Sequence, residues 1–359
     1  TSVIIPNSVT SIGMEAFERS DLTSITFPNS VTYIGGEVFY ECYSLTSVTI
    51  PSSVTYIGND AFYCCYNLTD VHITDLEAWC NNNYGDYPRA NHHLYLNGYE
   101  ITDLVIPNNV TTIRDHAFQN CIGLTSVTIP NSVTSVGSNA FSGCTGLTSV
   151  SLFNGLTLIG SSAFEGCKSI SSITIPSSVS TIANSAFMNC SSLRYIISEI
   201  QTPFDIQDNV FEGIDTYHTL TVPLGSKSAY LSTAGWNKFP IIIEEGGAGY
   251  VFESGGIYYL VGENNTVSVR RSLSYTGEIV IPSQVTFNGN TYSVTSVGMN
   301  AFTACSGLVS VTIPNSVTSI DNSAFYGSSV INVSIPNSGT MIDEEVFMNC
   351  SNLSSLTIP

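Results

Sequence analysis

Cysteine is the residue type of this chain with the widest chemical range, because thiolates act as nucleophiles, bind zinc and form disulfides. Eight of the ten cysteines recur at one position of a regular spacing: Cys42, Cys65, Cys121, Cys144, Cys167, Cys190, Cys305 and Cys350. We predict buried free thiols there, because equivalent side chains of adjacent repeats stack in parallel, without the perpendicular torsion of a disulfide. Cys64 and Cys80 lie off this spacing, and a disulfide between these two is the one that the sequence allows. No Cys-x-x-Cys pair occurs, which argues against structural zinc.

Histidine, the commonest metal ligand and general base, follows no catalytic spacing in this chain. The five histidines are His72, His92, His93, His116 and His218. His92 and His93 are neighbours on a strand-like segment, so their rings should point to opposite faces and cannot share a metal. The spacing therefore predicts no metal site.

The carboxylates and the motif content likewise argue against catalysis. Acidic residues cluster at 244–245 and 343–345, where they are adjacent in sequence. The two carboxylates of a glycosidase instead face each other across a cleft. The chain also has no metalloprotease, nucleophile-elbow, dinucleotide-binding or phosphate-loop motif. We expect a protein that is not an enzyme, with no catalytic residues and no cofactor.

A repeat of 22 or 23 residues organises the chain. Its consensus is L-x-x-V-x-I-P-x-x-V-x-x-I-x-x-x-A-F-x-x-C-x-x. The V-x-I step has the period of a short strand with both apolar residues inward, and the proline that follows ends the strand. A second short extended piece comes next, as at 133–136. The A-F-x-x-C segment should form a tight turn or a single helical turn that inserts its phenylalanine into the core. Since one repeat cannot bury its apolar face alone, the copies must stack.

The I-P dipeptide and the A-F-x-x-C segment closely resemble the BspA-type (Treponema-type) leucine-rich repeats of bacterial surface proteins. The resemblance covers most of the chain, because the phenylalanine keeps its register in eleven copies. It implies a repeat solenoid of the leucine-rich-repeat class, mostly β and irregular, with short parallel strands, short turns and about 23 residues per coil. In such repeats the cysteine position holds a small buried residue that bonds the turn backbone.

Two breaks in the repeat predict two solenoids. The first spans 1–245, with an inserted hairpin within about 74–104 and a C-terminal cap at about 193–245. The hairpin should turn at Asn97-Gly98 in a type I′ turn, and Trp236 with Phe239 should cover the end of the stack. Similar insertions occur in some BspA-type proteins. Glycine-rich 246–249 is expected to be a flexible joint. A second solenoid at 250–359 should begin with a β-hairpin cap at about 250–296 and stop within a repeat.

The composition limits the classes of partner. Net charge is −19, from 28 acidic and nine basic residues, and this field opposes nucleic acid and anionic lipid. No segment approaches the length of a membrane span, so we expect no direct membrane insertion. Only 10% of residues are charged, and a surface of Ser, Thr, Asn and Tyr favours an extracellular or cell-surface location.

The outward residues of the predicted strands form a surface of small hydroxyl side chains with two departures. One departure comprises Asp70, His72 and Asp103 beside the aromatic residues of the insertion, and the other is Tyr195 next to the cap. Since departures from a repeat often mark the binding face, we predict partner-binding residues there. They are Asp70, His72, Asp103, Trp79, Tyr84, Tyr87, Tyr95, Tyr99 and Tyr195. The alternative is that the insertion aromatics only pack their own loop.

These observations favour a surface or secreted protein that binds another protein without catalysis. The BspA-type resemblance implies adhesion to host matrix proteins or to other cells. A structural spacer that holds other domains away from the cell surface is the alternative, and the uniform Ser/Thr surface favours it. Ice binding by threonine rows fits less well, because Asp, His and Tyr interrupt the rows.

Overall fold

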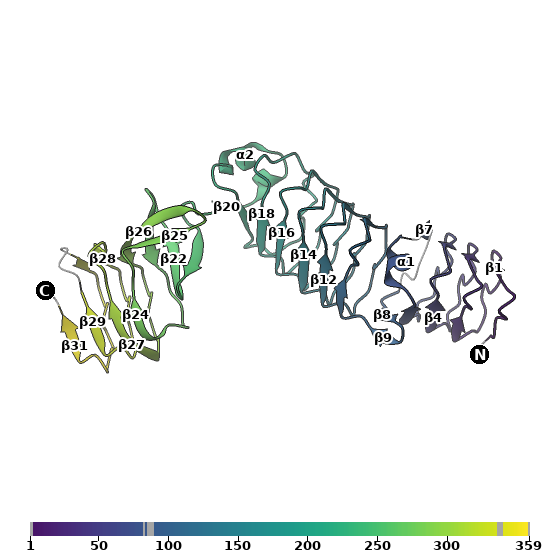
Figure 1. The fold of residues 1–359 in the computed structure, drawn as a ribbon, viewed down its shortest axis with the longest axis horizontal. Coiled ribbons are helices and arrows are strands. Elements are labelled where there is room, and N and C mark those ends of the chain that lie inside the picture. The colour runs from purple at the N-terminus through teal and green to yellow at the C-terminus, as the bar shows by residue number, and fades with distance from the viewer. Residues whose placement is uncertain (1–2, 82, 85–89, 336–339, 358–359) are drawn as a thin grey trace. The chain divides into compact units, whose positions relative to one another are not determined.

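A computed structural model describes residues 3–81, 83–84, 90–335 and 340–357. The chain forms two compact units, Thr1–Ile242 and Ile243–Pro359, each with its own apolar core. Each unit is a stack of coils, most of which contribute one longer and one shorter strand, so that two sets of parallel strands run along the stack (Figure 1). This architecture confirms the predicted parallel solenoid.

Most of the longer strands of the first unit come from the V-x-I step. The longer strands are β2 (Ser24–Thr26), β4 (Ser47–Ile50), β6 (Asp70–Ile73), β8 (His93–Leu96), β10 (Asp103–Val105), β12 (Ser126–Ile129), β14 (Ser149–Leu152), β16 (Ser172–Ile175), β18 (Tyr195–Ser198), β19 (Thr219–Val222) and β20 (Ile241–Glu244). Of these, β8 belongs to the insertion and β20 to the cap. Equivalent residues pair in parallel register, as Val127 does with Val150. Alternate side chains are therefore buried in the core, and the others point outward along one face.

The shorter strands of the first unit lie on the other side of each coil. They are β1 (Ser11–Ile12), β3 (Tyr33–Ile34), β5 (Tyr56–Ile57), β7 (Asn83–Tyr84), β11 (Thr112–Ile113), β13 (Ser135–Val136), β15 (Leu158–Ile159) and β17 (Thr181–Ile182). They form two four-stranded parallel sheets, so the second extended piece predicted at 133–136 is confirmed and is two residues long.

The A-F-x-x-C segment consists of consecutive turns and contains no helix. In the coil of Phe141, Asn139 and Gly143 have positive φ angles of 54° and 73°. The N–H groups of residues 139, 141 and 143 donate to the next coil at 2.7–2.8 Å, to the carbonyls of residues 161, 163 and 165. With alternate N–H groups donating along the stack, the segment keeps only i→i−3 turn bonds, such as Ser142 N–H to the Asn139 carbonyl at 3.1 Å, and does not form the i→i−4 bonds of an α-helix.

The core of the first unit is a ladder of like side chains. Phe118, Phe141, Phe164, Phe187 and Phe211 stack with ring centroids 5.2–5.4 Å apart. The thiol at the cysteine position donates to the carbonyl of the phenylalanine one coil earlier than its own. The donor and acceptor pairs include Cys144 with Phe118 and Cys167 with Phe141, at 3.0 and 3.1 Å. The cysteine therefore bonds the turn backbone, as the resemblance implies.

The C-terminal end of this ladder is covered by the predicted aromatic residues. Helix α2 (Lys227–Ser232) lies at this end of the first unit (Figure 1), and the 3₁₀ turn η1 (Trp236–Lys238) follows it in the chain. The rings of Trp236 and Phe239 pack against Phe211 at centroid distances of 5.8 and 5.3 Å. They take the place of the next coil's phenylalanine.

The insertion adds helix α1 (Leu76–Asn81) and a hairpin of β8 and β9 (Tyr99–Glu100). Asn97 and Gly98 have φ angles of 52° and 88°, so the hairpin turns at the predicted dipeptide with both central residues left-handed. Leu96 pairs with Tyr99, and Tyr95 with Glu100.

The second unit begins with antiparallel strands and continues as coils. Its strands are β21 (Val251–Ser254), β22 (Ile257–Val261), β23 (Thr266–Val269), β24 (Thr276–Val280), β25 (Gln284–Phe287), β26 (Asn290–Val297), β27 (Gly307–Thr312), β28 (Ser319–Ile320), β29 (Asn332–Ser334), β30 (Met341–Ile342) and β31 (Ser355–Thr357). Residues 246–249 are bound to this unit: Tyr292 donates to the Gly246 carbonyl, and the Gly249 N–H donates to Val261, both at 2.8 Å.

Candidate partner-binding surface

The outward residues of the longer strands in the first unit define a surface that we call the strand face. Over β12, β14 and β16 it carries small hydroxyl side chains, for example Ser126, Thr128 and Ser149. The strands lie side by side in Figure 1, so these side chains form rows across the stack. Such rows offer hydrogen-bonding groups but few large contact areas.

At β6 and β8 the rows no longer consist of small hydroxyl side chains. There the outward positions hold Asp70, His72, His93 and Tyr95, and the register places Asp70 beside His93 and His72 beside Tyr95. Glu100 pairs with Tyr95 across the hairpin and so adds a carboxylate to the same side. We call these five residues the acid–aromatic patch.

Contacts within the acid–aromatic patch hold its side chains in place. The rings of His72 and Tyr95 stack with centroids 4.6 Å apart, and Glu100 Oε1 lies 2.5 Å from His93 Nδ1. The pKa of Tyr95 is raised, first by partial burial and then by its hydrogen bond to the Asp70 carboxylate. Tyr95 therefore stays a neutral phenol at physiological pH, with its ring held against His72.

Two members of this patch, His93 and Glu100, were not among the predicted binding residues. The sequence carries a signal for Glu100: a two-residue Asn-Gly turn fixes the pairing of the hairpin, which places residue 100 opposite residue 95. His93 lies two residues before Tyr95 on the same strand, so the alternation that places Tyr95 on the outward side also places His93 there.

The prediction that Trp79 contacts a partner is wrong. Its side chain is 2% exposed, and its indole Nε1 donates to the Ala117 carbonyl at 2.7 Å. The guanidinium of Arg114 lies 5.1 Å from the indole ring. Helix α1 turns this ring into the core, where it belongs to the first hydrophobic cluster. This residue follows the alternative, in which the insertion aromatics pack the loop itself.

Of the other tyrosines predicted in the insertion, Tyr99 does not join Tyr95 on the strand face. Tyr99 is 81% exposed, but its pairing with Leu96 places it on the opposite side of the hairpin from Tyr95. Tyr84 lies in β7, whose backbone pairs with β5 in a sheet of shorter strands. Tyr87 lies outside the described residues.

Asp103 and Tyr195 lie on the strand face, but at other coils. Asp103 begins the next sheet, β10–β12–β14, and accepts a hydrogen bond from Ser126 Oγ at 2.6 Å. Tyr195 is 60% exposed on β18. The structure thus brings Asp70, His72 and Tyr95 together and leaves Asp103 and Tyr195 as separate positions.

The thiols of the repeat lie in an environment that suppresses reactivity. Burial raises the pKa of the Cys144 and Cys167 thiols well above the usual value. Cys350, in the last coil, is half-buried. Cys64 and Cys80 are both free: Cys64 Sγ lies 3.0 Å from the Tyr66 hydroxyl, and Cys80 is buried. No disulfide therefore joins the one pair that the sequence left open.

His92 is the histidine with the most unusual surroundings. Its side chain is buried, with Nδ1 2.9 Å from the Ala90 carbonyl and Nε2 3.2 Å from Cys121 Sγ. Burial lowers the pKa of His92 to about 4. A neutral ring that donates from Nδ1 and accepts the thiol hydrogen at Nε2 satisfies both contacts. His93, its neighbour, points to the strand face, as the alternation predicts.

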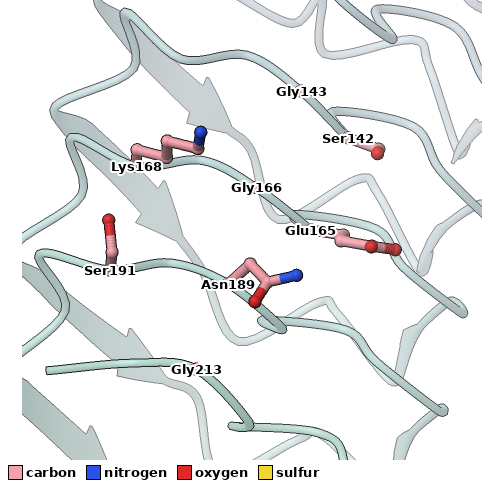
Figure 2. Close-up of a pocket in the computed structure, with 8 residues that line it drawn as sticks. All are labelled: Ser142, Gly143, Glu165, Gly166, Lys168, Asn189, Ser191 and Gly213. Carbon is pink, nitrogen blue, oxygen red and sulfur yellow. The ribbon is translucent and has the colours of Figure 1, made fainter. Parts of the chain in front are cut away.

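A groove of about 480 Å³ runs over the turns near Gly143 and Gly166, where glycine replaces larger residues (Figure 2). Lys168 and Ser191 lie at one end, and Ser142 and Glu165 at the other. Among the described residues, these four side chains form no hydrogen bonds with one another. Nor does the described part of the chain contain a group of three or more His, Cys, Asp or Glu side chains that could hold a metal ion.

In the described parts of the chain, no helix has the length and apolar character needed to cross a membrane.

The comparisons with solved structures return leucine-rich-repeat proteins. One is a leucine rich cell surface protein from Faecalibacterium prausnitzii A2-165, with 23% identity over 97% of this chain and 82% of the other and a TM-score of 0.31. A leucine-rich repeat protein from Bacteroides ovatus ATCC 8483 shares 22% identity over 97% and 82%, with a TM-score of 0.38. A T. pallidum leucine rich repeat protein shares 24% identity over 64% and 89%, with a TM-score of 0.34.

No curated protein matches the chain. The profile described as BspA type leucine rich repeat region matches in six copies over residues 1–83, 91–219 and 280–359. These ranges contain most of the coils and the phenylalanine and cysteine ladders. The chain belongs to the BspA-type leucine-rich-repeat family.

Proposed function

We propose that this chain is a non-catalytic binding protein of the bacterial cell surface and that the acid–aromatic patch captures a protein ligand. The observation that carries the proposal is the change of the strand face at β6 and β8, where Ser and Thr give way to Asp70, His72, His93 and Tyr95. Leucine-rich-repeat solenoids commonly bind proteins through an extended face, and departures from the repeat concentrate there.

The composition of the patch suits protein recognition. Tyrosine supplies a large contact area with little conformational freedom to lose, and the stacking with His72 restricts Tyr95 further. His93 and Glu100 have side chains that are 39% and 35% exposed, so both can still reach a partner. Asp70 and Glu100 add negative charge to a chain of net charge −19, which favours a ligand with a basic surface.

The arrangement of polar groups supports a non-catalytic role. Nucleophilic and metal-assisted catalysis place a nucleophile or a metal beside a base, within reach of a shared reacting atom. The Cys121 thiol and the His92 ring lie close together, but both are buried and His92 is neutral at physiological pH. Membership of the BspA-type leucine-rich-repeat family supports the proposed location at the cell surface.

Replacement of patch residues by the residues of neighbouring coils tests the proposal. The full chain with His72→Thr and Tyr95→Thr keeps the pattern of β4, where Thr49 holds the equivalent position. We expect capture of the chain by immobilised host matrix proteins, or by intact host cells, to fall at least about tenfold, as for the loss of a central aromatic contact. The measurement is surface plasmon resonance or cell binding. Deletion of the insertion is unsuitable, because it would remove the buried Trp79.

The matched control is Tyr217→Ser, which removes another tyrosine that is 83% exposed in the same unit. It should leave capture unchanged. Equal loss of binding in both variants, or unchanged binding when the patch is replaced, would contradict the assignment of the binding site. If no matrix protein or cell surface binds the unmodified chain, the proposed function fails.

A further inference from the structure

A second departure from the repeat forms a groove at the carboxyl ends of β10, β12 and β14, where the strands pass into the following turns. Position 105 holds valine where the aligned strands carry Thr128 and Ser151. Position 153 holds phenylalanine where the preceding coil has Pro130. These two departures lie two coils apart in sequence, yet both line one groove of about 460 Å³, together with Thr128 and Pro130.

Both apolar side chains are open to the outside. Val105 is 64% exposed and Phe153 is 44% exposed, although most aromatic and aliphatic residues of these coils are buried. The backbone of the Phe153 coil comes close to the coil before it: a Cβ atom at Gly155 would lie 1.8 Å from the Asn131 carbonyl oxygen. Glycine at 155 thus allows the close approach of the two coils beside the groove, which Asn131 also lines.

A carboxylate stands next to the groove. Asp103 and Val105 are both exposed on β10, two residues apart, so their side chains leave the strand on the same side, about 7 Å from each other. Ser126 and Thr125 donate to Asp103 Oδ1 at 2.6 and 3.3 Å, which fixes the carboxylate. Among the described residues no Lys, Arg or His forms an ion pair with it, so its charge is available to a ligand.

We propose that this groove docks an extended segment of a partner protein in which a basic residue lies two positions from an aliphatic or aromatic residue. An extended peptide presents alternate side chains about 7 Å apart, which matches the separation of Asp103 and the groove. The apolar side chain enters between Val105 and Phe153, and the basic one pairs with Asp103. Net charge −19 opposes an acidic segment.

The proposal deepens the proposed function, because it assumes that the strand face binds proteins, but it concerns coils separate from the acid–aromatic patch. The test uses a display library of random linear heptapeptides, selected on the full chain. We expect enriched peptides to share a Lys or Arg two positions from a Leu, Ile, Val or Phe. Synthetic copies are then measured by fluorescence anisotropy.

Two variants restore the repeat and should therefore fold. Val105→Thr copies Thr128, and Phe153→Pro copies Pro130. The turn that follows is alike in both coils, with Leu156 donating to Phe153 and Val133 to Pro130, each at 3.1 Å. We expect the double variant to weaken peptide binding by at least about tenfold. Asp103→Asn should weaken it less and reduce its dependence on salt. Retained fluorescence of Trp79 and Trp236 verifies folding.

The outcomes separate this inference from the proposed function. If the library yields no shared motif, or if its peptides bind the Val105→Thr, Phe153→Pro chain as tightly as the unmodified chain, the groove is not the docking site. Peptides that lose binding only when His72 and Tyr95 are replaced would also overturn the groove and support the acid–aromatic patch. Peptides that bind the groove while matrix proteins ignore the chain would uphold the groove and contradict the proposed capture of host matrix.

Discussion

At the scale of single residues, the side chains that could be reactive, the cysteine thiols and the His92 ring, form hydrogen bonds that hold the coils together. The Cys144 thiol donates to the Phe118 carbonyl at 3.0 Å, and the same contact recurs from coil to coil. His92 takes a comparable place beside Cys121, where the insertion interrupts the regular spacing. These bonds satisfy backbone and side-chain groups that burial would otherwise leave unpaired.

His92 makes the first unit sensitive to acid. Its pKa is about 4 in the folded chain and about 6.5 when unfolded, so below pH 6.5 the unfolded chain binds a proton that the folded chain does not. Stability is therefore complete above pH 6.5 and falls as the pH drops toward 4. We expect a loss of about 2 kcal/mol in the free energy of unfolding between pH 7 and pH 5.

Urea unfolding followed by tryptophan fluorescence measures this effect, because Trp79 and Trp236 both lie in the first unit. His92→Gln should remove most of the decrease between pH 7 and pH 5. The same decrease in that variant would assign the pH dependence to other groups.

The left-handed residues of the turns offer a second test. Ser162 has a φ angle of 54°, a left-handed conformation that is strained in any residue with a Cβ atom. Its neighbour Ser161 does not have a positive φ angle. We expect Ser162→Gly to stabilise the first unit by about 1 kcal/mol and Ser161→Gly to destabilise it by about 0.5–1 kcal/mol. The midpoints of denaturant unfolding of the two variants give the comparison. A loss of stability in both variants would show that the backbone at Ser162 is not strained.

At the scale of elements, each coil depends on its neighbours. Phe164 is fully buried, with rings of Phe141 and Phe187 at 5.3 and 5.4 Å on its two sides. Phe17, in the first described coil, is half-buried, and among the described residues its ring stacks on one other, that of Phe39, at 5.6 Å. The contribution of a phenylalanine should thus depend on its place in the ladder.

Truncation of these two rings measures that dependence. We expect Phe164→Ala to lower the free energy of unfolding by about 4 kcal/mol, since it leaves a cavity between two packed rings. Phe17→Ala should lower it by about 2 kcal/mol, because this ring is only partly buried in the unmodified chain. Both changes are followed by tryptophan fluorescence in urea. Equal losses would show that stability is not built from contacts between neighbouring coils.

At the scale of the whole molecule, a uniform interior contrasts with a surface that changes along the stack. The ten cysteines make this contrast measurable, because seven of them are buried at the ladder position while Cys64 is half-buried in a turn. Thiol reagents attack the thiolate and need access to it, and burial both raises the pKa and blocks access.

A thiol titration of the native chain at pH 8 should therefore label Cys64 first and Cys350, which is also half-buried, more slowly. The buried thiols, including Cys144 and Cys167, should react only after unfolding. Mass spectrometry after labelling identifies the sites, and Cys64→Ser should remove the fast phase. Rapid labelling of Cys144 in the native chain would contradict the buried ladder.

Part of the candidate surface could be predicted, and the reason lies in the regularity of the strands. Strand alternation suffices to place Asp70, His72 and Tyr95 outward, because each follows the repeat register. Trp79 could not be placed this way, since helix α1 is outside the repeat and its ring direction depends on contact with residue 117, which is 38 positions away. The side on which Tyr99 lies follows from the pairing of the hairpin, which places it opposite Leu96, and the presence of an aromatic residue does not decide it.

The sequence by itself determined the coil, its period and its buried ladders, because like residues at equal spacing can satisfy one another only by stacking. Only the tertiary structure decided which departures from the repeat meet. Val105 and Phe153 are 48 positions apart and line one groove because adjacent coils bring residues 23 apart into contact. Tyr84 and Tyr95 are closer in sequence, yet they lie in different sheets, because β7 pairs with the shorter strand β5 and β8 with the longer strand β6.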